Sequence, residues 1–262
     1  MEIDSNTSFL NRIPSFMPGI SMDFVVFGYK ERTLHILMLK YLNTDAWALP
    51  GGFLPKDAEM DKVAHAILED RTGVSNIFLD QFYTFNSLNR GWDCNDVSRN
   101  AFEKLRETWN KEEKETLDEW FGQRFISTAY LSLMNAQEVV PDPDYISDDC
   151  AWVPIEELPS VVLDHELMIQ KALEYIRLRI NYLPIGRSLL EEKFTMSDLQ
   201  ALYEAILGRK MDAGNFQRKM KKLNMLNRHE KLMTGAANKA PYLYSINDEV
   251  YDRLLEQGIG FT

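Results

Sequence analysis

The chain has 262 residues, of which 45% are hydrophobic and 11% aromatic, which is enough for one large or two ordinary cores and too much for a disordered protein. No apolar run reaches the roughly 18 residues of a membrane span, and the polar start with Pro14 and Pro18 lacks the pattern of a signal peptide, so we expect a cytoplasmic protein with no membrane contact. The two cysteines, Cys94 and Cys150, indicate thiols in a reducing compartment.

Charge is distributed unevenly along the chain. The net charge of −11 would by itself argue against a nucleic-acid partner. Residues 1–183 carry 17 Lys and Arg against 30 Asp and Glu, a net charge of −13, whereas residues 184–262 carry 12 against 10. Within residues 209–239 the counts are 9 and 2, a net charge of +7. An acidic body with one short basic segment indicates a dedicated polyanion-binding end.

The first part of the chain predicts a sheet with two helices. Residues 60–72 carry their apolar side chains on one stripe, which predicts a helix that Gly73 ends in the left-handed conformation. A second, long helix is expected from the capping residue Asp164 to about Leu183. The segments with strand character, rich in β-branched and aromatic residues, are 21–29, 33–41, 76–84, 125–134 and 151–153.

A charged segment of about residues 90–123 interrupts this pattern. Its apolar residues recur at helical spacing and predict one or two amphipathic helices inserted into the first domain. They are Phe102, Leu105, Trp109, Leu117, Trp120 and Phe121. Two roles stay open: a surface elaboration, or a contact with a dimer partner or another protein.

Residues 51–74, GGFLPKDAEMDKVAHAILEDRTGV, resemble the Nudix box, and Trp47-Ala48-Leu49-Pro50 precedes them as in many Nudix proteins. The resemblance implies a mixed sheet among helices and a family that hydrolyses nucleoside diphosphates linked to another group. In active members, a glutamate six residues after the second glycine and an Arg-Glu and a Glu-Glu pair on the helix hold magnesium, which activates water.

Most of those carboxylates are missing here. The first glutamate position is Ala58, the Arg-Glu pair is Ala66-Ile67 and the Glu-Glu pair is Asp70-Arg71. Because alanine and isoleucine cannot ligate a hard cation, we predict no metal, no cofactor and no enzymatic activity. The alternative is a hydrolase with displaced ligands. Its candidate carboxylates, on a different helix face, are Glu59, Asp61 and Glu69.

The C-terminal part predicts a winged helix. Pro184-Ile185-Gly186 marks a boundary between residues 1–183 and 184–262. Thr195 and Asp198 form a capping-box pattern at the start of one helix, and Asp212 can cap the next. A strand-like run at 231–233, a turn containing Gly235 and a strand at 242–246 follow. Two short helices and then a hairpin is the order of a winged helix.

Several segments resemble the Nudix-related transcriptional regulators, which fuse a Nudix-like sensor to a C-terminal winged helix. They are Leu163-Asp164-His165 with Met168, Pro184-Ile185-Gly186, residues 194–200, residues 202–206 and Asn215-Phe216. The resemblance spans about residues 21–251, apart from 90–123. It implies an α+β fold, with a Nudix-type mixed sheet flanked by helices and a winged helix-turn-helix domain. It also implies a homodimeric repressor of a sugar-utilisation or NAD-metabolism operon. The alternatives are the hydrolase with an accessory domain and a non-catalytic scaffold whose insertion binds another protein.

The second helix of the winged-helix pattern is the predicted recognition helix for an operator in double-stranded DNA. Asn215 and Arg218 are the predicted base readers. The predicted phosphate and wing contacts are Lys219, Lys221, Lys222, Arg228, Lys231 and Lys239. A basic helix face is often only solvated, but its place on this helix of an acidic chain favours DNA.

The effector is expected to be a small molecule that contacts Trp47, Arg71 and Tyr83. The resemblance implies either a pentose or another sugar, or an NAD-derived nucleotide such as ADP-ribose. Because the first domain has a net charge of −13, its field repels a diphosphate, so we expect an uncharged sugar unless Arg71 reverses that preference. His165 is expected to be a core or capping histidine.

Overall fold

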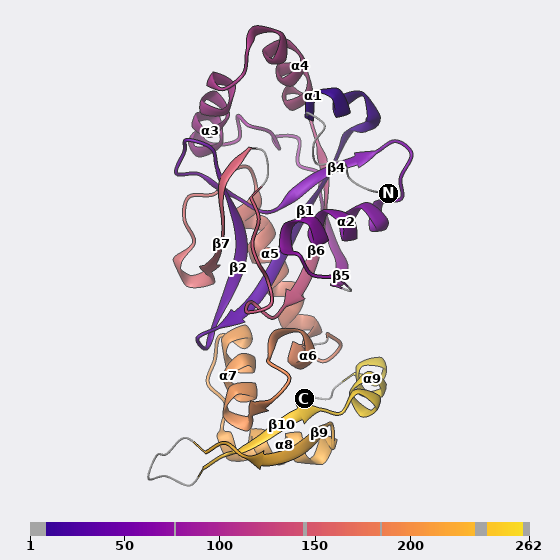
Figure 1. Ribbon diagram of the computed structural model, residues 1–262, viewed down its shortest axis with the longest axis vertical. Coiled ribbons are helices and arrows are strands. Elements are labelled where there is room, and N and C mark those ends of the chain that lie inside the picture. Colours follow the sequence, from indigo (N-terminus) through magenta and orange to yellow (C-terminus); the bar gives the residue numbers. More distant parts are fainter. Residues whose placement is uncertain (1–8, 76, 144–145, 184, 234–239, 259–262) are drawn as a thin grey trace.

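The structure is a computed structural model that describes residues 9–75, 77–143, 146–183, 185–233 and 240–258, and two sheets dominate these residues (Figure 1). The larger sheet has the strand order β3-β2-β1-β6-β5, with β4 pairing to β1 and β7 pairing to β2. Its strands are β1 (Phe16–Lys30), β2 (Thr33–Tyr41), β3 (Trp47–Ala48), β4 (Gly51–Pro55), β5 (Phe78–Phe85), β6 (Ile126–Met134) and β7 (Ser147–Pro154). Since β1 and β6 run parallel and the other pairs antiparallel, the sheet is mixed.

Strand β1 is buried on both faces, which explains its nearly continuous apolar sequence. Successive side chains point to opposite faces of a strand. Met22 and Phe24 therefore pack toward α2 (Met60–Thr72). Val25 and Phe27 pack toward α5 (His165–Arg179). The sheet thus lies between a core that contains α2 and a core that contains α5.

The helices of this part follow the predicted pattern closely. Helix α2 ends at Gly73, which has the expected left-handed conformation with a φ of 68°. The inserted segment forms two helices, α3 (Asp96–Glu107) and α4 (Lys111–Gly122), which lie at the end of the molecule opposite the C-terminal sheet (Figure 1). Short helical turns complete the part: α1 (Phe9–Arg12), η1 (Ile13–Ser15) and η2 (Ile155–Glu157).

The C-terminal part has the predicted winged-helix order. Its elements are α6 (Ile185–Leu189), β8 (Phe194–Thr195), α7 (Met196–Leu207), α8 (Ala213–Leu223), β9 (Leu226–Lys231), β10 (Tyr242–Ile246) and α9 (Asp248–Gln257), with the strand order β8-β10-β9. The capping box is present: the Asp198 N–H donates to Thr195 Oγ1 at 3.2 Å, and the Thr195 N–H donates to Asp198 Oδ2 at 3.0 Å.

Several boundaries differ from the prediction: strand β1 begins earlier, at Phe16, and β7 is longer, Ser147–Pro154. The first strand of the hairpin is β9, residues 226–231, so the prediction at 231–233 was wrong by about five residues. Leu232 and Met233, which suggested that strand, are exposed. Helix α5 ends at Arg179 rather than near Leu183. Asn76, Gly235 and Lys239 lie outside the described residues.

The two parts pack against each other through α5 and α7. One buried cluster extends from the face of the large sheet that packs on α5, through Ile176 of α5, to Tyr203 of α7. Arg32 forms an ion pair with Asp198 at 2.9 Å, and Arg177 Nε donates to the Ile206 carbonyl at 2.8 Å. The predicted domain boundary at 183/184 stays a prediction, and residue 184 lies outside the described residues.

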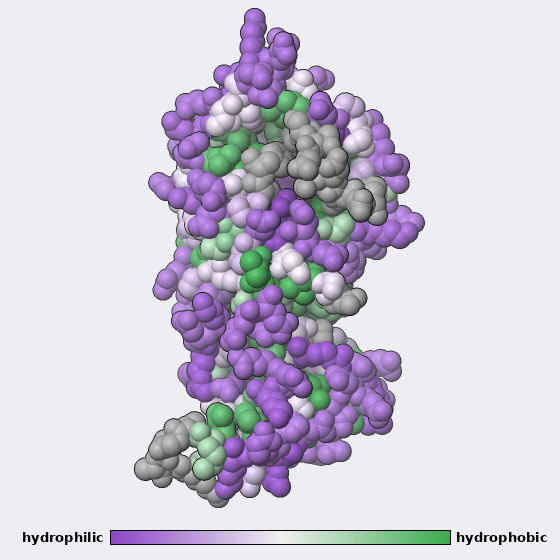
Figure 2. All heavy atoms as spheres, in the orientation of Figure 1, coloured by the Kyte–Doolittle hydropathy of each residue, from purple (hydrophilic) through white to green (hydrophobic). Residues whose placement is uncertain are grey.

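Hydrophilic residues cover most of the face seen in Figure 2, and hydrophobic residues appear in separate patches in the upper part, near the middle and at the lower end. Within the described ranges, no helix combines the length and the apolar character that crossing a membrane requires.

Candidate functional site

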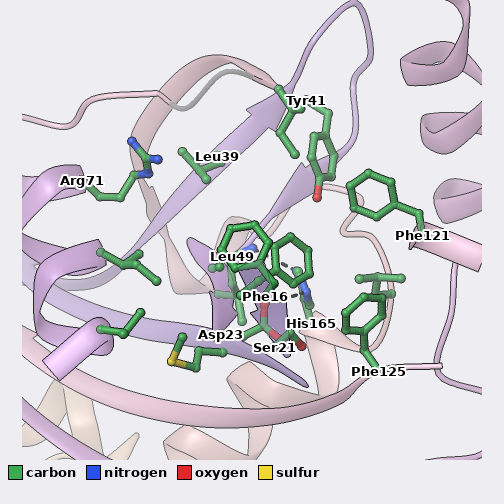
Figure 3. A pocket seen from close by; sticks show the side chains of 18 of the residues that line it. Phe16, Ser21, Asp23, Leu39, Tyr41, Leu49, Arg71, Phe121, Phe125 and His165 are labelled. Carbon is green, nitrogen blue, oxygen red and sulfur yellow. Dashed lines mark hydrogen bonds and ion pairs between the residues drawn. The ribbon is translucent and has the colours of Figure 1, made fainter. Parts of the chain in front are cut away.

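A cavity lies between the large sheet, helix α2 and the inserted segment (Figure 3). Its floor includes Asp23 of β1 and the glycine pair Gly51-Gly52 of β4, and its far wall includes Trp92 and Phe121 of the insertion. The glycines allow close packing here. A Cβ on Gly51 would lie 2.7 Å from Asp23 Oδ1, and one on Gly52 would lie 2.6 Å from Cδ1 of an α2 side chain, Ile67.

Buried charges form a network at the base of the cavity. Arg90 Nη2 donates to Asp23 Oδ2 at 2.8 Å, and Arg90 Nε donates to Asp164 Oδ1 at 3.0 Å. Ser127 Oγ donates a short hydrogen bond to Asp23. The side chain of Arg90 is 5% exposed, so its guanidinium joins β1 to the N-terminus of α5 with little access to water.

His165 links this network to the backbone of the cavity wall. Its Nδ1 accepts a hydrogen bond from the Leu49 N–H at 3.0 Å, so the proton of the neutral ring is on Nε2, which lies 3.6 Å from Asp23 Oδ1. Burial lowers the pKa of His165, and the Arg90 charge acts in the same direction against the opposing effect of Asp23. The prediction of a core histidine therefore describes its burial, but His165 also lines the cavity.

Three buried polar atoms of the cavity lining make no hydrogen bond within the part of the chain that the structure describes: Ser21 Oγ, Arg71 Nε and His165 Nε2. A buried polar group without a partner costs free energy. A ligand that brings matching donors and acceptors removes this cost, so the arrangement favours a polar small molecule in the cavity.

The Nudix-like helix α2 turns two of its substituted positions toward the cavity. Ile67 and Arg71 both line it, and Arg71 forms an ion pair with Asp70 at 3.2 Å. Asp61, a candidate displaced ligand, instead accepts a hydrogen bond from the Tyr130 hydroxyl at 2.8 Å. Among the described residues, no group of three His, Cys, Asp or Glu side chains is placed to hold a metal ion. A metal-free site stays a prediction.

The three predicted effector residues do not come together. Arg71 lines the cavity, whereas Trp47 is absent from its described lining and packs beside the core that contains α5. Tyr83 is 50% exposed on β5 and lines a second, shallower hollow with Asn86 and Asn95. Sequence reasoning missed Asp23 and Arg90, which are 67 residues apart and carry no shared spacing signal.

Helix α8 carries five of the eight predicted DNA-binding residues, and four of the five are exposed. Phe216 and Met220 of this helix are buried, and Asp212 caps the helix by accepting from the Asn215 N–H at 2.8 Å. Arg218 also donates to the Asn215 side chain, so the two predicted base readers lie side by side. The exposed predicted residues of α8 are Asn215, Arg218, Lys221 and Lys222. Lys219 is half-buried, and burial lowers its pKa.

The hairpin carries two further predicted DNA-binding residues, and both contact one aromatic ring. The Arg228 guanidinium lies 4.6 Å and the Lys231 ammonium 5.4 Å from the centre of the Tyr242 ring. These cation–π contacts fix the two predicted wing residues on one face of the hairpin. Tyr242 was not among the predicted site residues.

Comparison with known proteins gives a family match for the C-terminal part and a relative along most of the chain. Residues 186–246 match the family model described as the NrtR DNA-binding winged helix domain. The chain is 24% identical over 254 residues to a protein named ADPR responsive transcriptional repressor NtrR, from Acinetobacter baylyi, with 91% of this chain and 88% of that protein aligned.

Solved structures share the fold. NrtR of Shewanella oneidensis is similar with a TM-score of 0.65 and 21% identity, over 89% of this chain and 96% of that chain. The same protein complexed with a 27mer DNA gives a TM-score of 0.64, with 20% identity over 88% and 95%. A MutT/nudix family protein from Enterococcus faecalis gives 0.59, with 16% identity over 88% and 87%. These likenesses confirm the predicted fold class and the predicted resemblance.

Proposed function

We propose that this chain, which has the NrtR-family architecture of a Nudix-like domain with a C-terminal winged-helix DNA-binding domain, is a transcriptional repressor that ADP-ribose controls. The DNA-binding part of the proposal rests on the exposed basic face of α8, the predicted recognition helix of the winged helix. The relative from Acinetobacter baylyi, named an ADPR responsive repressor, supports the sign of regulation and the effector.

ADP-ribose replaces the pentose that the net charge favoured. That preference used the charge of the whole first domain, but a ligand responds most strongly to the charges nearest to it. Apart from His165, the charged residues of the described cavity lining are three arginines and two aspartates: Arg12, Arg71, Arg90, Asp23 and Asp70. Arg90 is paired with Asp164 as well as Asp23, so three arginines face three aspartates there. The charges at the cavity are therefore close to balanced, and the charge of −13 summed over the domain is no argument against an anionic ligand.

We further propose a division into an effector domain, residues 1–183, and a DNA-binding domain, residues 184–262, and a homodimer that places two winged helices on one operator. Substituted ligand positions such as Ile67 support a domain that binds its ligand without hydrolysing it. The alternative, a Nudix hydrolase, requires a set of metal ligands, and α2 offers few carboxylates toward the cavity.

The test begins with an operator selected from a random-sequence duplex pool and measures binding by fluorescence anisotropy. We expect ADP-ribose to release the DNA, and binding to weaken steeply as salt rises, because bound lysines displace counterions. Arg218→Ala should cost about 1–3 kcal/mol and relax specificity, whereas Lys222→Ala should weaken all sequences alike. Lys111→Ala, an exposed lysine of α4 at the other end of the molecule, is the matched control.

Two results would refute the proposal. If the selection enriched no sequence, the proposed DNA-binding function would be refuted. If an enriched duplex bound with the same affinity at saturating ADP-ribose, ADP-ribose would be refuted as the effector, and the proposed DNA-binding function would be kept.

A further inference from the structure

Four aromatic side chains of the inserted segment pack together in one group. The Trp92 and Phe102 rings are stacked with centres 5.1 Å apart, Phe102 meets Trp109 edge-on at 5.8 Å, and Trp109 stacks on Phe121 at 6.1 Å. Phe121 also meets Trp92 edge-on at 6.2 Å and Phe102 at 6.1 Å, and we call these four residues the aromatic cluster. It joins the start of the insertion, α3 and α4, so it holds the two helices together.

Of the aromatic cluster, only Trp92 and Phe121 belong to the described cavity lining. Trp92 also lies 5.7 Å from the ring of Tyr41 on β2, and Phe121 lies 6.2 Å from the ring of Phe53 on β4. Both side chains are half-buried. One wall of the cavity is therefore built from aromatic rings that the insertion brings to the sheet.

The opposite side of the cavity carries Arg71, which is paired with Asp70 at 3.2 Å. Figure 3 shows Arg71 across the cavity from Phe121 and Phe125, with Asp23 and His165 at the base between them. An arginine guanidinium matches the oxygens of a phosphate in a bidentate geometry. The cavity thus presents a surface for a planar ring on one side and a donor for an anionic group on the other.

The insertion is fixed to the rest of the cavity at its first turn. Arg90 is buried between two aspartates, and Asn95 Nδ2 donates to the Leu163 carbonyl at 3.2 Å. Ser98 Oγ accepts from the Leu163 N–H at 2.7 Å. Because these bonds tie the insertion to β1 and to the start of α5, the aromatic wall has a defined position before a ligand binds, which lowers the entropic cost of binding.

We propose that the inserted segment 90–123 is the base-selecting part of the effector site, in which Trp92 and Phe121 stack on the adenine of an adenine nucleotide while Arg71 binds its phosphates. The proposal rests on the effector function stated above and extends it to a segment with no assigned role. It also explains why a sugar alone is a poor fit, since a pentose has no planar ring to stack on Trp92 and Phe121.

The experiment titrates ADP-ribose, AMP and ribose 5-phosphate calorimetrically into the wild-type full chain, Trp92→Ala, Phe121→Ala, Trp92→Phe and Trp109→Leu. Each alanine variant should lose about 5- to 150-fold in affinity for ADP-ribose and AMP, the ratio that corresponds to about 1–3 kcal/mol of base–aromatic stacking. Affinity for ribose 5-phosphate should stay unchanged, and Trp92→Phe should restore most of the loss. Trp109→Leu, in the aromatic cluster but outside the described lining, measures the effect of loosening the cluster and should lose less than either alanine variant.

The outcomes separate the two proposals. Wild type that binds AMP through Trp92 but not ADP-ribose would support the base-selecting role and refute the proposed effector. The base-selecting role alone would be overturned in two cases, both with wild type that binds ADP-ribose. In one, the alanine variants bind ADP-ribose with wild-type affinity; in the other, they lose as much affinity for ribose 5-phosphate as for ADP-ribose. Binding of none of the three probes would overturn both.

Discussion

Replacing Arg90 by methionine should destabilise the protein strongly, because the guanidinium neutralises two carboxylates that have little access to water. The exposed fractions are 5% for Arg90, 10% for Asp23 and 19% for Asp164. Removing one partner of a buried ion pair costs about 3–5 kcal/mol. Asp23 keeps the Ser127 hydroxyl and Asp164 lies closer to water, so we expect the lower end, about 3 kcal/mol. The measurement is urea denaturation followed by tryptophan fluorescence. With m-values of about 1–3 kcal/mol/M, the midpoint should fall by roughly 1–3 M.

Arg99→Met is the matched control for this substitution. Arg99 lies in the same insertion and also contacts two aspartates, Asp96 at 2.7 Å and Asp93 at 3.7 Å, but its side chain is 47% exposed. Exposed pairs of this kind contribute about 0–1 kcal/mol. Equal free energies of unfolding for the Arg90 and Arg99 variants, with unchanged m-values, would show that burial does not govern the contribution of this network.

Three further predictions concern the pH dependence, the catalytic activity and the wing. Burial lowers the pKa of His165 in the folded chain, so the unfolded state binds more protons below the ordinary pKa of 6.5. The free energy of unfolding should therefore fall as the pH drops below about 6.5. His165→Gln should flatten that pH dependence in urea titrations between pH 5 and 8. Purified protein with magnesium or manganese should release no AMP from ADP-ribose above a blank, and turnover near about 1 per second would identify an enzyme instead. Tyr242→Leu should weaken operator binding about 2- to 5-fold in anisotropy, since each cation–π contact contributes about 0.5–1 kcal/mol, whereas Tyr242→Phe keeps the ring and should bind as wild type; equal weakening by both would assign the effect to the hydroxyl.

The sequence predicted most of the fold because burial imposes a period on it. The two-sided burial of β1 and the apolar stripe of α2 appear directly in the order of residues. The prediction failed where burial imposes no such pattern. Strand β9 is mostly exposed on both faces and reads as a polar loop, while the exposed pair Leu232 and Met233 resembles a strand. Helix α9 was missed although Asn247 and two acidic residues mark its start.

The site was predicted in part, for a similar reason. Arg71 was found because the Nudix frame fixes its position on the cavity-facing side of α2. Arg90 could not be found, because its partners lie 67 and 74 residues away and only the folded sheet brings them together. The preference for a sugar had a weak basis for the same cause, since a net charge summed over the sequence contains no information on which charges line the cavity.

Helix α5 provides the physical connection between the cavity and the winged-helix part. Its cap, Asp164, holds Arg90, and its last turn carries Arg177, which donates to the Ile206 carbonyl of α7. A helix of 15 residues spans about 22 Å as a stiff rod, so a displacement of its first turn moves its last. One guanidinium cannot pair fully with two carboxylates and a phosphate at the same time. An anionic ligand that drew Arg90 away from Asp164 would therefore act on the first turn of α5, and it would shift an equilibrium between two states of the chain only by binding them with different affinity.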